Sequence, residues 1–186
     1  IDPQGLDIGQ IGGRRNIIIN GAMQVAQRGT STSVGTNTAG YSPDRFRLFT
    51  AGTTAADIKQ VTTVPSGEGF AKSLQIDVTT ADSTLAAGDA IGVAYRFEGQ
   101  DLQQLRKGSS NAKSVTLSFW VRSSKTGTHI AELYDNDNTR AISKAYTIST
   151  ADTWEYKTIT YAGDTSGSLD NDNLRSMTLN FWLGSG

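Results

Sequence analysis

The chain contains no cysteine, a single histidine and only three prolines in 186 residues. Without cysteine it has no disulfides, no thiol nucleophile and no thiolate metal site. Any Ser-His-Asp triad would have to use His129 as its base, and no Gly-x-Ser-x-Gly turn accompanies that residue. One histidine also leaves no ligand set typical of a transition metal. The sequence therefore argues against the commonest catalytic sites.

The chain has no strong excess of either charge and no long apolar run. Its net charge is −1, and its lysines and arginines are scattered along the sequence. A nucleic-acid partner is not expected, because such proteins carry a basic patch or stripe. No apolar run approaches the roughly 20 residues of a membrane-spanning helix, and no basic-then-apolar start resembles a signal peptide. We therefore expect no membrane insertion.

Small residues and aromatic residues dominate what is present. Glycine, serine and threonine make up about a third of the chain, which also has six Phe, six Tyr and three Trp. Glycine costs about 1 kcal/mol in a helix interior, and threonine loses side-chain freedom there. The aromatic residues argue for a packed core rather than a disordered chain. This composition favours an all-β fold with many tight turns.

Candidate strands recur along the chain between clusters of Gly, Ser, Asn and Asp. They lie near residues 16–19, 45–50, 57–64, 72–78, 90–98, 114–123, 128–135, 140–148, 154–161 and 177–183. Two segments, 99–108 and 170–174, resemble short helical turns, and the first ends at a glycine. We find no internal repeat, which removes solenoid architectures. The pattern predicts two stacked antiparallel sheets, a β-sandwich.

Alternation in three of these segments separates a core face from an outer face. Every second side chain of a half-buried strand points to the core. The residues predicted to face inward are Val115, Leu117, Phe119, Val121, Ile91, Val93, Tyr95, Phe97, Met177, Leu179, Phe181 and Leu183. In the segment 154–161 the alternation does not show which of the two faces is buried.

The opening of the chain carries its most specific pattern. Residues 14–31 read RRNIIINGAMQVAQRGTS, and residues 41–46 read YSPDRF. This sequence closely resembles the opening of virion fibre proteins, phage tail fibres among them. Their opening has the form N-[IL]-I-I-N-G-x-x-Q-V-x-Q-R-G, followed by Y-x-x-D-R. The resemblance implies a jelly-roll domain related to carbohydrate-binding modules. Ala22 and Ala26 depart from it, because relatives carry bulkier or acidic residues there.

The resemblance also implies a division of the chain. Residues 1–13 read as a glycine-punctuated connector from an upstream fibre or stalk segment, and residues 14–186 as the jelly roll. Family members continue past the position of Gly186 to a strand that closes the sandwich. We therefore expect the jelly roll to be incomplete at its C-terminal end.

Outward-facing tryptophans are the strongest candidates for a binding site. Trp120 and Trp182 alternate with core residues, and Arg122 shares the face of Trp120. An indole ring stacks on the apolar face of a sugar while polar neighbours bind its hydroxyls. Arg96 and Asn180 contribute hydrogen bonds if their strands lie beside the first two. The alternative is that these rings are covered by a loop, a partner subunit or a missing C-terminal segment.

Two other patterns have a structural interpretation beside a functional one. Segments 135–138 and 170–173, both Asp-Asn-Asp-Asn, are rich in oxygen ligands, but neither fits the EF-hand template. Asx-rich turns are the favoured interpretation, and a structural calcium is the alternative, without a supporting motif. Asp44 and Arg45 are interpreted as structural, with the carboxylate accepting backbone N–H bonds or pairing with Arg14 or Arg15.

The family resemblance implies a non-enzymatic phage virion fibre module, commonly a homotrimer, that binds host surface polysaccharide. A purely structural virion module, joining fibre to particle or subunit to subunit, is the main alternative. A surface-polysaccharide hydrolase is the third, because its carboxylate pair is defined by distance rather than by a motif. The location implied is the virion, and the partners are the chain itself, other virion proteins and host polysaccharide.

Overall fold

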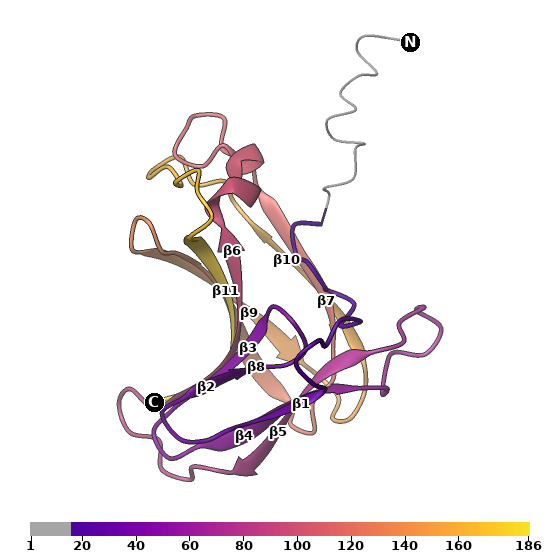
Figure 1. Cartoon of the computed structure of the whole chain (residues 1–186). Coiled ribbons are helices and arrows are strands. Elements are labelled where there is room, and N and C mark those ends of the chain that lie inside the picture. The colour runs from indigo at the N-terminus through magenta and orange to yellow at the C-terminus, as the bar shows by residue number, and fades with distance from the viewer. Residues whose placement is uncertain (1–15) are drawn as a thin grey trace.

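The computed structural model describes residues 16–186, and the expected connector at 1–13 lies outside them. The fold is an all-β sandwich of antiparallel sheets, as the composition predicts (Figure 1). Its strands are β1 (Ser31–Val34), β2 (Ala39–Tyr41), β3 (Phe46–Ala51), β4 (Ala55–Val61), β5 (Ser73–Thr80), β6 (Ala90–Glu98), β7 (Val115–Val121), β8 (Gly127–Asp135), β9 (Arg140–Ile148), β10 (Glu155–Tyr161) and β11 (Arg175–Ser185).

One layer is a single large sheet and the other is divided. Six strands form the large sheet in the order β2-β3-β6-β11-β8-β9. Facing it are a three-stranded sheet, β1-β4-β5, and a two-stranded sheet, β10-β7. In Figure 1 the strands β7 and β10 lie across from β6 and β11, while β1, β4 and β5 lie together at the lower end.

Each small sheet covers its own half of the large one. Ile58 of β4 lies in a core cluster with Leu48, Tyr95 and Leu179 of the large sheet. Side chains of β7 and β10 form a second cluster with those of β8 and β9, among them Ile159, Tyr161, Ala131 and Tyr146. Phe181 packs against both clusters. The buried face of β10, which alternation left open, is therefore the one that carries Ile159 and Tyr161.

The side chains predicted to face inward do so. Tyr95, Phe97 and Leu179 are buried, and Leu117 and Phe119 pack against the core clusters. The ring of Phe119 meets those of Tyr146 and Phe181 at 5.1 and 5.0 Å, close to edge-on. Aromatic pairs prefer this arrangement. Period-two alternation therefore predicted the core correctly.

The strand predicted at 16–19 is corrected, because residues 16–18 are irregular. Of the two segments that resemble helical turns, 99–108 forms two short 3-10 helices, η1 (Gly99–Asp101) and η2 (Gln103–Leu105), which confirms the prediction. Residues 171–174 form bends rather than a helical coil. Strands β1 and β2 were missed, because they are short and rich in Gly, Ser and Thr. None of the helices in the part of the chain described has the length and apolarity needed to cross a membrane.

Candidate functional site

The structure separates the five predicted binding residues into two groups. Arg96 lies on β6, and Asn180 and Trp182 lie on β11, its hydrogen-bonded neighbour in the large sheet. Trp120 and Arg122 belong to β7 and the residues just after it, in the opposite layer. Their outer faces point away from each other, so the five residues do not form one site. We treat the outer face of the large sheet first.

Two aromatic rings meet across the middle of this outer face. Phe49 of β3 and Trp182 of β11 flank Gly92 of β6 from either side. Their ring centroids are 5.4 Å apart, with the planes at 85°. A Cβ on Gly92 would lie 2.6 Å from Cζ of Phe49, so only glycine leaves room for this ring. We call Phe49, Gly92 and Trp182 the aromatic row.

A row of polar side chains lies beside the aromatic row, two residues further along each strand. Arg47, Asn180, Glu132 and Ser143 follow one another across β3, β11, β8 and β9, with Ala94 of β6 between the first two. The Asn180 amide donates to Glu132 Oε1 at 2.9 Å, and the Ser143 hydroxyl donates to Oε2 at 3.2 Å. Both carboxylate oxygens of Glu132 are therefore held in place by neighbouring strands.

The face is hollowed around these rows. The hollow is open to solvent and has a volume of about 500 Å³. Its lining residues are Arg47, Phe49, Ala94, Arg96, Glu132, Tyr134, Asn136, Ala141, Arg175, Thr178, Asn180 and Trp182. Three residues predicted from sequence, Arg96, Asn180 and Trp182, are among them. Side chains of this kind, rings beside fixed hydrogen-bonding groups, are those that ligand sites use to bind and orient a molecule.

Sequence reasoning missed the residues that β3 contributes to this face. Alternation in 45–50 places Phe46 and Leu48 in the core, which puts Arg47 and Phe49 outside. That signal was available in the sequence. The contact between Phe49 and Trp182 was not available, because these residues are far apart in the sequence and only the pairing of β3 and β11 with β6 brings them together.

The outer face of the smaller β10-β7 sheet carries a second aromatic pair. The rings of Trp120 and Tyr156 lie 5.4 Å apart across the two strands, and Tyr156 is 55% exposed. Arg122 donates through Nε to the Asp152 carbonyl at 2.8 Å and through a terminal nitrogen to its carboxylate at 3.2 Å. The guanidinium beside Trp120 is thus held by the protein itself. The outer face of the β10-β7 sheet therefore presents aromatic rings to solvent, while its guanidinium group is already bonded within the protein.

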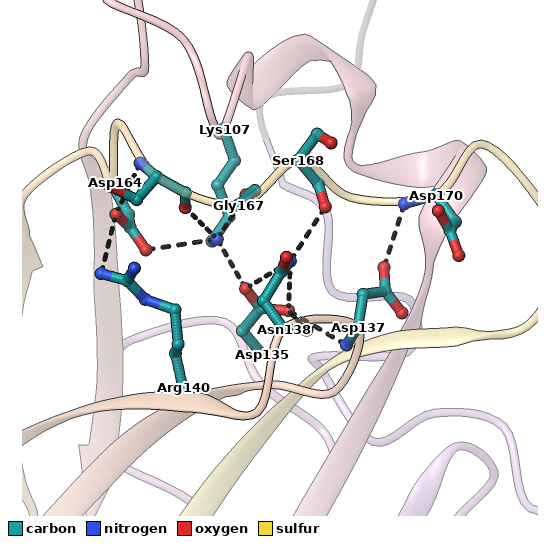
Figure 2. Close-up of polar contacts among 10 residues, drawn as sticks. Lys107, Asp135, Asp137, Asn138, Arg140, Asp164, Gly167, Ser168 and Asp170 are labelled. Atoms are coloured by element: carbon teal, nitrogen blue, oxygen red, sulfur yellow. Dashed lines mark hydrogen bonds and ion pairs between the residues drawn. The ribbon is translucent and has the colours of Figure 1, made fainter.

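The two acidic segments considered for calcium lie side by side, and a lysine binds the first of them (Figure 2). Lys107 Nζ lies 2.5 Å from Asp135 and 3.2 Å from Asp164, and it donates to the carbonyls of Ser166 and Gly167. The side chains of Lys107 and Asp135 are only 9% and 5% exposed. Because an ammonium group already neutralises Asp135, this carboxylate does not fit a resident calcium. Among residues 16–186 no cluster of three or more acidic or histidine side chains suits a metal.

The same network holds three loops together. Asp135 Oδ1 accepts the backbone N–H groups of Asp137 and Asn138, an Asx turn at the end of β8. Asn138 donates to the Ser168 carbonyl, and Asp137 accepts the Asp170 N–H at 3.0 Å. These bonds join the β8–β9 turn to the β10–β11 loop (Figure 2). The Asp-Asn segments therefore act as structural turns.

The opening motif also has a structural role in the described residues. Ile17, Ile18 and Met23 pack against the main core cluster, and the Ile19 N–H donates to the Tyr95 hydroxyl at 2.8 Å. The side-chain amide of Asn20 donates to the Val25 carbonyl and accepts the Val25 N–H. The irregular segment thus closes one side of the sandwich.

Asp44 and Arg45 confirm their structural interpretation. The Asp44 carboxylate accepts the Gln27 N–H at 3.2 Å, and the Asn20 amide donates to the Asp44 carbonyl. Arg45 pairs with Glu98 at 3.2 Å and lies over the ring of Tyr95. The carboxylate of Asp44 thus accepts a backbone N–H bond, as expected, while the alternative pairing with Arg14 or Arg15 lies outside the described residues.

Comparison with solved structures supports the fold. The chain is similar to a domain described as the enzymatically active domain of tailspike protein 4 of bacteriophage CBA120, with a TM-score of 0.51 and 14% identity. That likeness covers 92% of this chain and 19% of the tailspike chain, so this chain spans about a fifth of its length. The family 11 carbohydrate-binding module of the cellulosomal cellulase Lic26A-Cel5E of Clostridium thermocellum also aligns, with a TM-score of 0.40, 15% identity and coverage of 88% and 84%. No protein-family model and no curated protein matches the sequence.

Proposed function

We propose that this chain is a non-enzymatic module of a phage fibre, carried on the virion, and that the outer face of its six-stranded sheet binds a glycan of the host surface. The observation that carries the proposal is the aromatic row, Phe49, Gly92 and Trp182, in an open hollow beside fixed polar groups. The resemblance of the opening motif to virion fibre proteins supports the location. The homotrimer and contacts with other virion proteins belong to the same proposal.

The hollow has the chemistry that a sugar needs. A sugar ring presents an apolar C–H face, which stacks on aromatic rings, and hydroxyls that both donate and accept. Glu132, held by Asn180 and Ser143, accepts hydroxyl donors, while Arg47 and the Asn180 amide donate. Because the hollow is open to solvent, a polysaccharide chain can reach it from outside.

Removal of the aromatic row tests the proposal. We expect Trp182→Ala to weaken binding to host polysaccharide at least tenfold by isothermal titration calorimetry, because the stacking of a sugar on this ring is lost. A single site should bind weakly, around millimolar, and trimeric display should raise the effective strength about a hundredfold. Trp120→Ala, on the opposite layer, is the matched control and should leave the affinity unchanged. Equal affinity of wild type and Trp182→Ala would remove the site.

The non-enzymatic assignment has its own measurement. Incubation of the protein with the polysaccharide that it binds should release no reducing ends and leave the polymer length unchanged. Release of reducing ends that depends on Glu132 or Glu98 would instead support the surface-polysaccharide hydrolase.

The second candidate is a purely structural virion module, and the pair Trp120 and Tyr156 favours it. These rings are partly exposed on β7 and β10, and the nearby Arg122 is already bonded to Asp152. Aromatic residues are enriched in protein–protein interfaces. The two candidates use opposite layers, so they make different predictions for substitutions on each face.

A further inference from the structure

Three arginines gather at one end of the hollow. Arg47 comes from β3, Arg96 from β6 and Arg175 from the start of β11. Arg47 is paired with Ala94, Arg96 lies two residues beyond Ala94, and Arg175 pairs with Glu98 two residues further on. Each of these three neighbouring strands therefore contributes one guanidinium group, and each group lies one row further along the sheet than the one before. We call these residues the arginine cluster.

The acidic side chains of the described residues do not neutralise the arginine cluster. Among residues 16–186, none of the three guanidinium groups has a carboxylate oxygen within 4.0 Å. The two acids on this face are otherwise engaged: Glu98 pairs with Arg45 and accepts the Gln100 amide, and Glu132 accepts Asn180 and Ser143. The cluster thus keeps its positive charge available to a ligand.

Two further observations indicate that an anion would stabilise the cluster. Nε of Arg96 is buried and has no hydrogen-bond partner, which is costly for a charged donor. The pKa of Arg47 is lowered, first by burial and then by the charges of Arg96 and Arg175. Arg47 also lies over the ring of Phe49, with Cζ 5.7 Å from the ring centroid, so the cluster is continuous with the aromatic row.

From this arrangement we infer that the glycan bound in the hollow is acidic, with a carboxylate or phosphate group at the arginine cluster and a sugar ring on the aromatic row. The inference deepens the proposed function and rests on it. Arginine is suited to this role because its planar fork binds carboxylate and phosphate groups through two parallel hydrogen bonds. Arg96 lies four residues from Gly92 along β6, about 14 Å at the usual strand rise, so the occupant extends beyond a single ring.

The distribution of charge favours a glycan over a nucleic acid. The chain has a net charge of −1, and the outer face carries Glu132 on the side away from the arginine cluster. A nucleic acid would bring a phosphate at each nucleotide and place some of them near that carboxylate. An acidic polysaccharide with neutral sugars between its charges avoids this repulsion.

The experiment compares acidic polymers with their uncharged counterparts. Binding of the protein to hyaluronan and xanthan, which carry neutral sugars between their carboxylates, is measured by calorimetry beside the carboxyl-reduced form of each, and a polymer of alternating sugar and phosphate is added as the phosphate source. We expect at least one acidic polymer to bind about tenfold or more tightly than its reduced form at low salt, with the difference falling as salt is added. Carboxylate and phosphate sources are told apart by which polymer binds.

Variants of the arginine cluster assign the effect to these residues. Arg175→Gln, at an exposed position, should weaken binding of the acidic polymer about tenfold and leave binding of the reduced form unchanged. Arg96→Gln should do the same, and Arg96→Lys should restore part of the affinity because it keeps the charge but not the fork. Arg122→Gln removes one charge from the opposite layer and should change neither affinity.

The outcomes separate this inference from the proposed function. Equal binding of acidic and reduced polymers, lost in Trp182→Ala, would overturn the acidic ligand and leave the glycan site standing. No binding to any polymer or to host polysaccharide would overturn both. Single-stranded DNA that binds as tightly as the acidic polymers, with the same dependence on Arg175, would replace the glycan by a nucleic acid.

Discussion

Lys107 and Asp135 form a buried ion pair. Lys107 also pairs with Asp164 and donates to two carbonyls, and Asp135 accepts two backbone N–H groups. Removal of one partner from a buried pair leaves the other charge uncompensated, which typically costs about 3–5 kcal/mol. We therefore expect Lys107→Met to lower the free energy of unfolding by about that amount, measured by urea denaturation.

Lys59 supplies the control for this substitution. It pairs with Asp57 and Asp77 on the strands β4 and β5. Pairs in contact with solvent contribute little, so Lys59→Met should leave the urea midpoint nearly unchanged. Equal midpoints for Lys107→Met and wild type would show that the network in Figure 2 does not stabilise the fold.

Two buried tyrosines predict how stability changes at high pH. Burial raises the pKa of Tyr146 to about 12 and that of Tyr161 to about 12, from an ordinary value of 10.0. Between pH 10.0 and about 12 the unfolded chain loses these protons while the folded chain keeps them, so stability falls as the pH rises. Each group contributes a slope that approaches about 1.4 kcal/mol per pH unit.

Unfolding at a series of pH values measures this slope. Tyr146→Phe removes one titrating group and should make the fall in stability above pH 10.0 shallower. Tyr156→Phe, at an exposed position, should leave the slope as in wild type. A slope unaffected by Tyr146→Phe would contradict the assignment.

At the scale of elements, β6 holds the aromatic row in place through a glycine. A Cβ at position 92 would lie 2.6 Å from Cζ of Phe49 and 2.9 Å from the Phe181 carbonyl oxygen. We expect Gly92→Ala to displace Phe49, to cost about 1–3 kcal/mol of stability as overpacking does, and to weaken polysaccharide binding. Calorimetry and urea denaturation measure the two effects.

Gly184 of β11 provides a matched glycine. A Cβ there would meet Cγ2 of Ile91 at 3.4 Å, an ordinary van der Waals contact. Gly184→Ala should therefore cost less stability than Gly92→Ala and leave polysaccharide binding unchanged. The reverse order would show that the space beside Phe49 is not what matters.

At the scale of the whole molecule, the divided layer predicts how subunits assemble. If the homotrimer forms through the β10-β7 sheet, Trp120→Ala and Tyr156→Ala should weaken it without a change in polysaccharide binding. Light scattering at micromolar concentration, on a protein that includes residues 1–13, measures this. A monomeric wild type would contradict the trimer, and a trimer unaffected by both substitutions would place the interface elsewhere.

Alternation by itself determined the fold class and the core. It identified Phe97, Leu117 and Leu179 as inward-facing, because the side-chain period of a strand is a local property of the sequence. It also placed Trp120 and Trp182 on outer faces correctly. The short strands β1 and β2 escaped it, since their Gly, Ser and Thr residues give little hydrophobic contrast.

Only the tertiary structure decided which outward residues share a surface. Strand order is set by long-range pairing and core packing, and these put β6 and β11 side by side while β7 lies in the opposite layer. Trp182 therefore meets Phe49 rather than Trp120, and Arg96 joins Arg47 and Arg175. The same long-range packing brings Lys107 against Asp135 and Asp164, so that an ammonium group lies beside an Asp-Asn segment that in sequence resembles a cation site. The residues of each strand determine which side chains face outward, and the pairing of distant strands determines which of them act together.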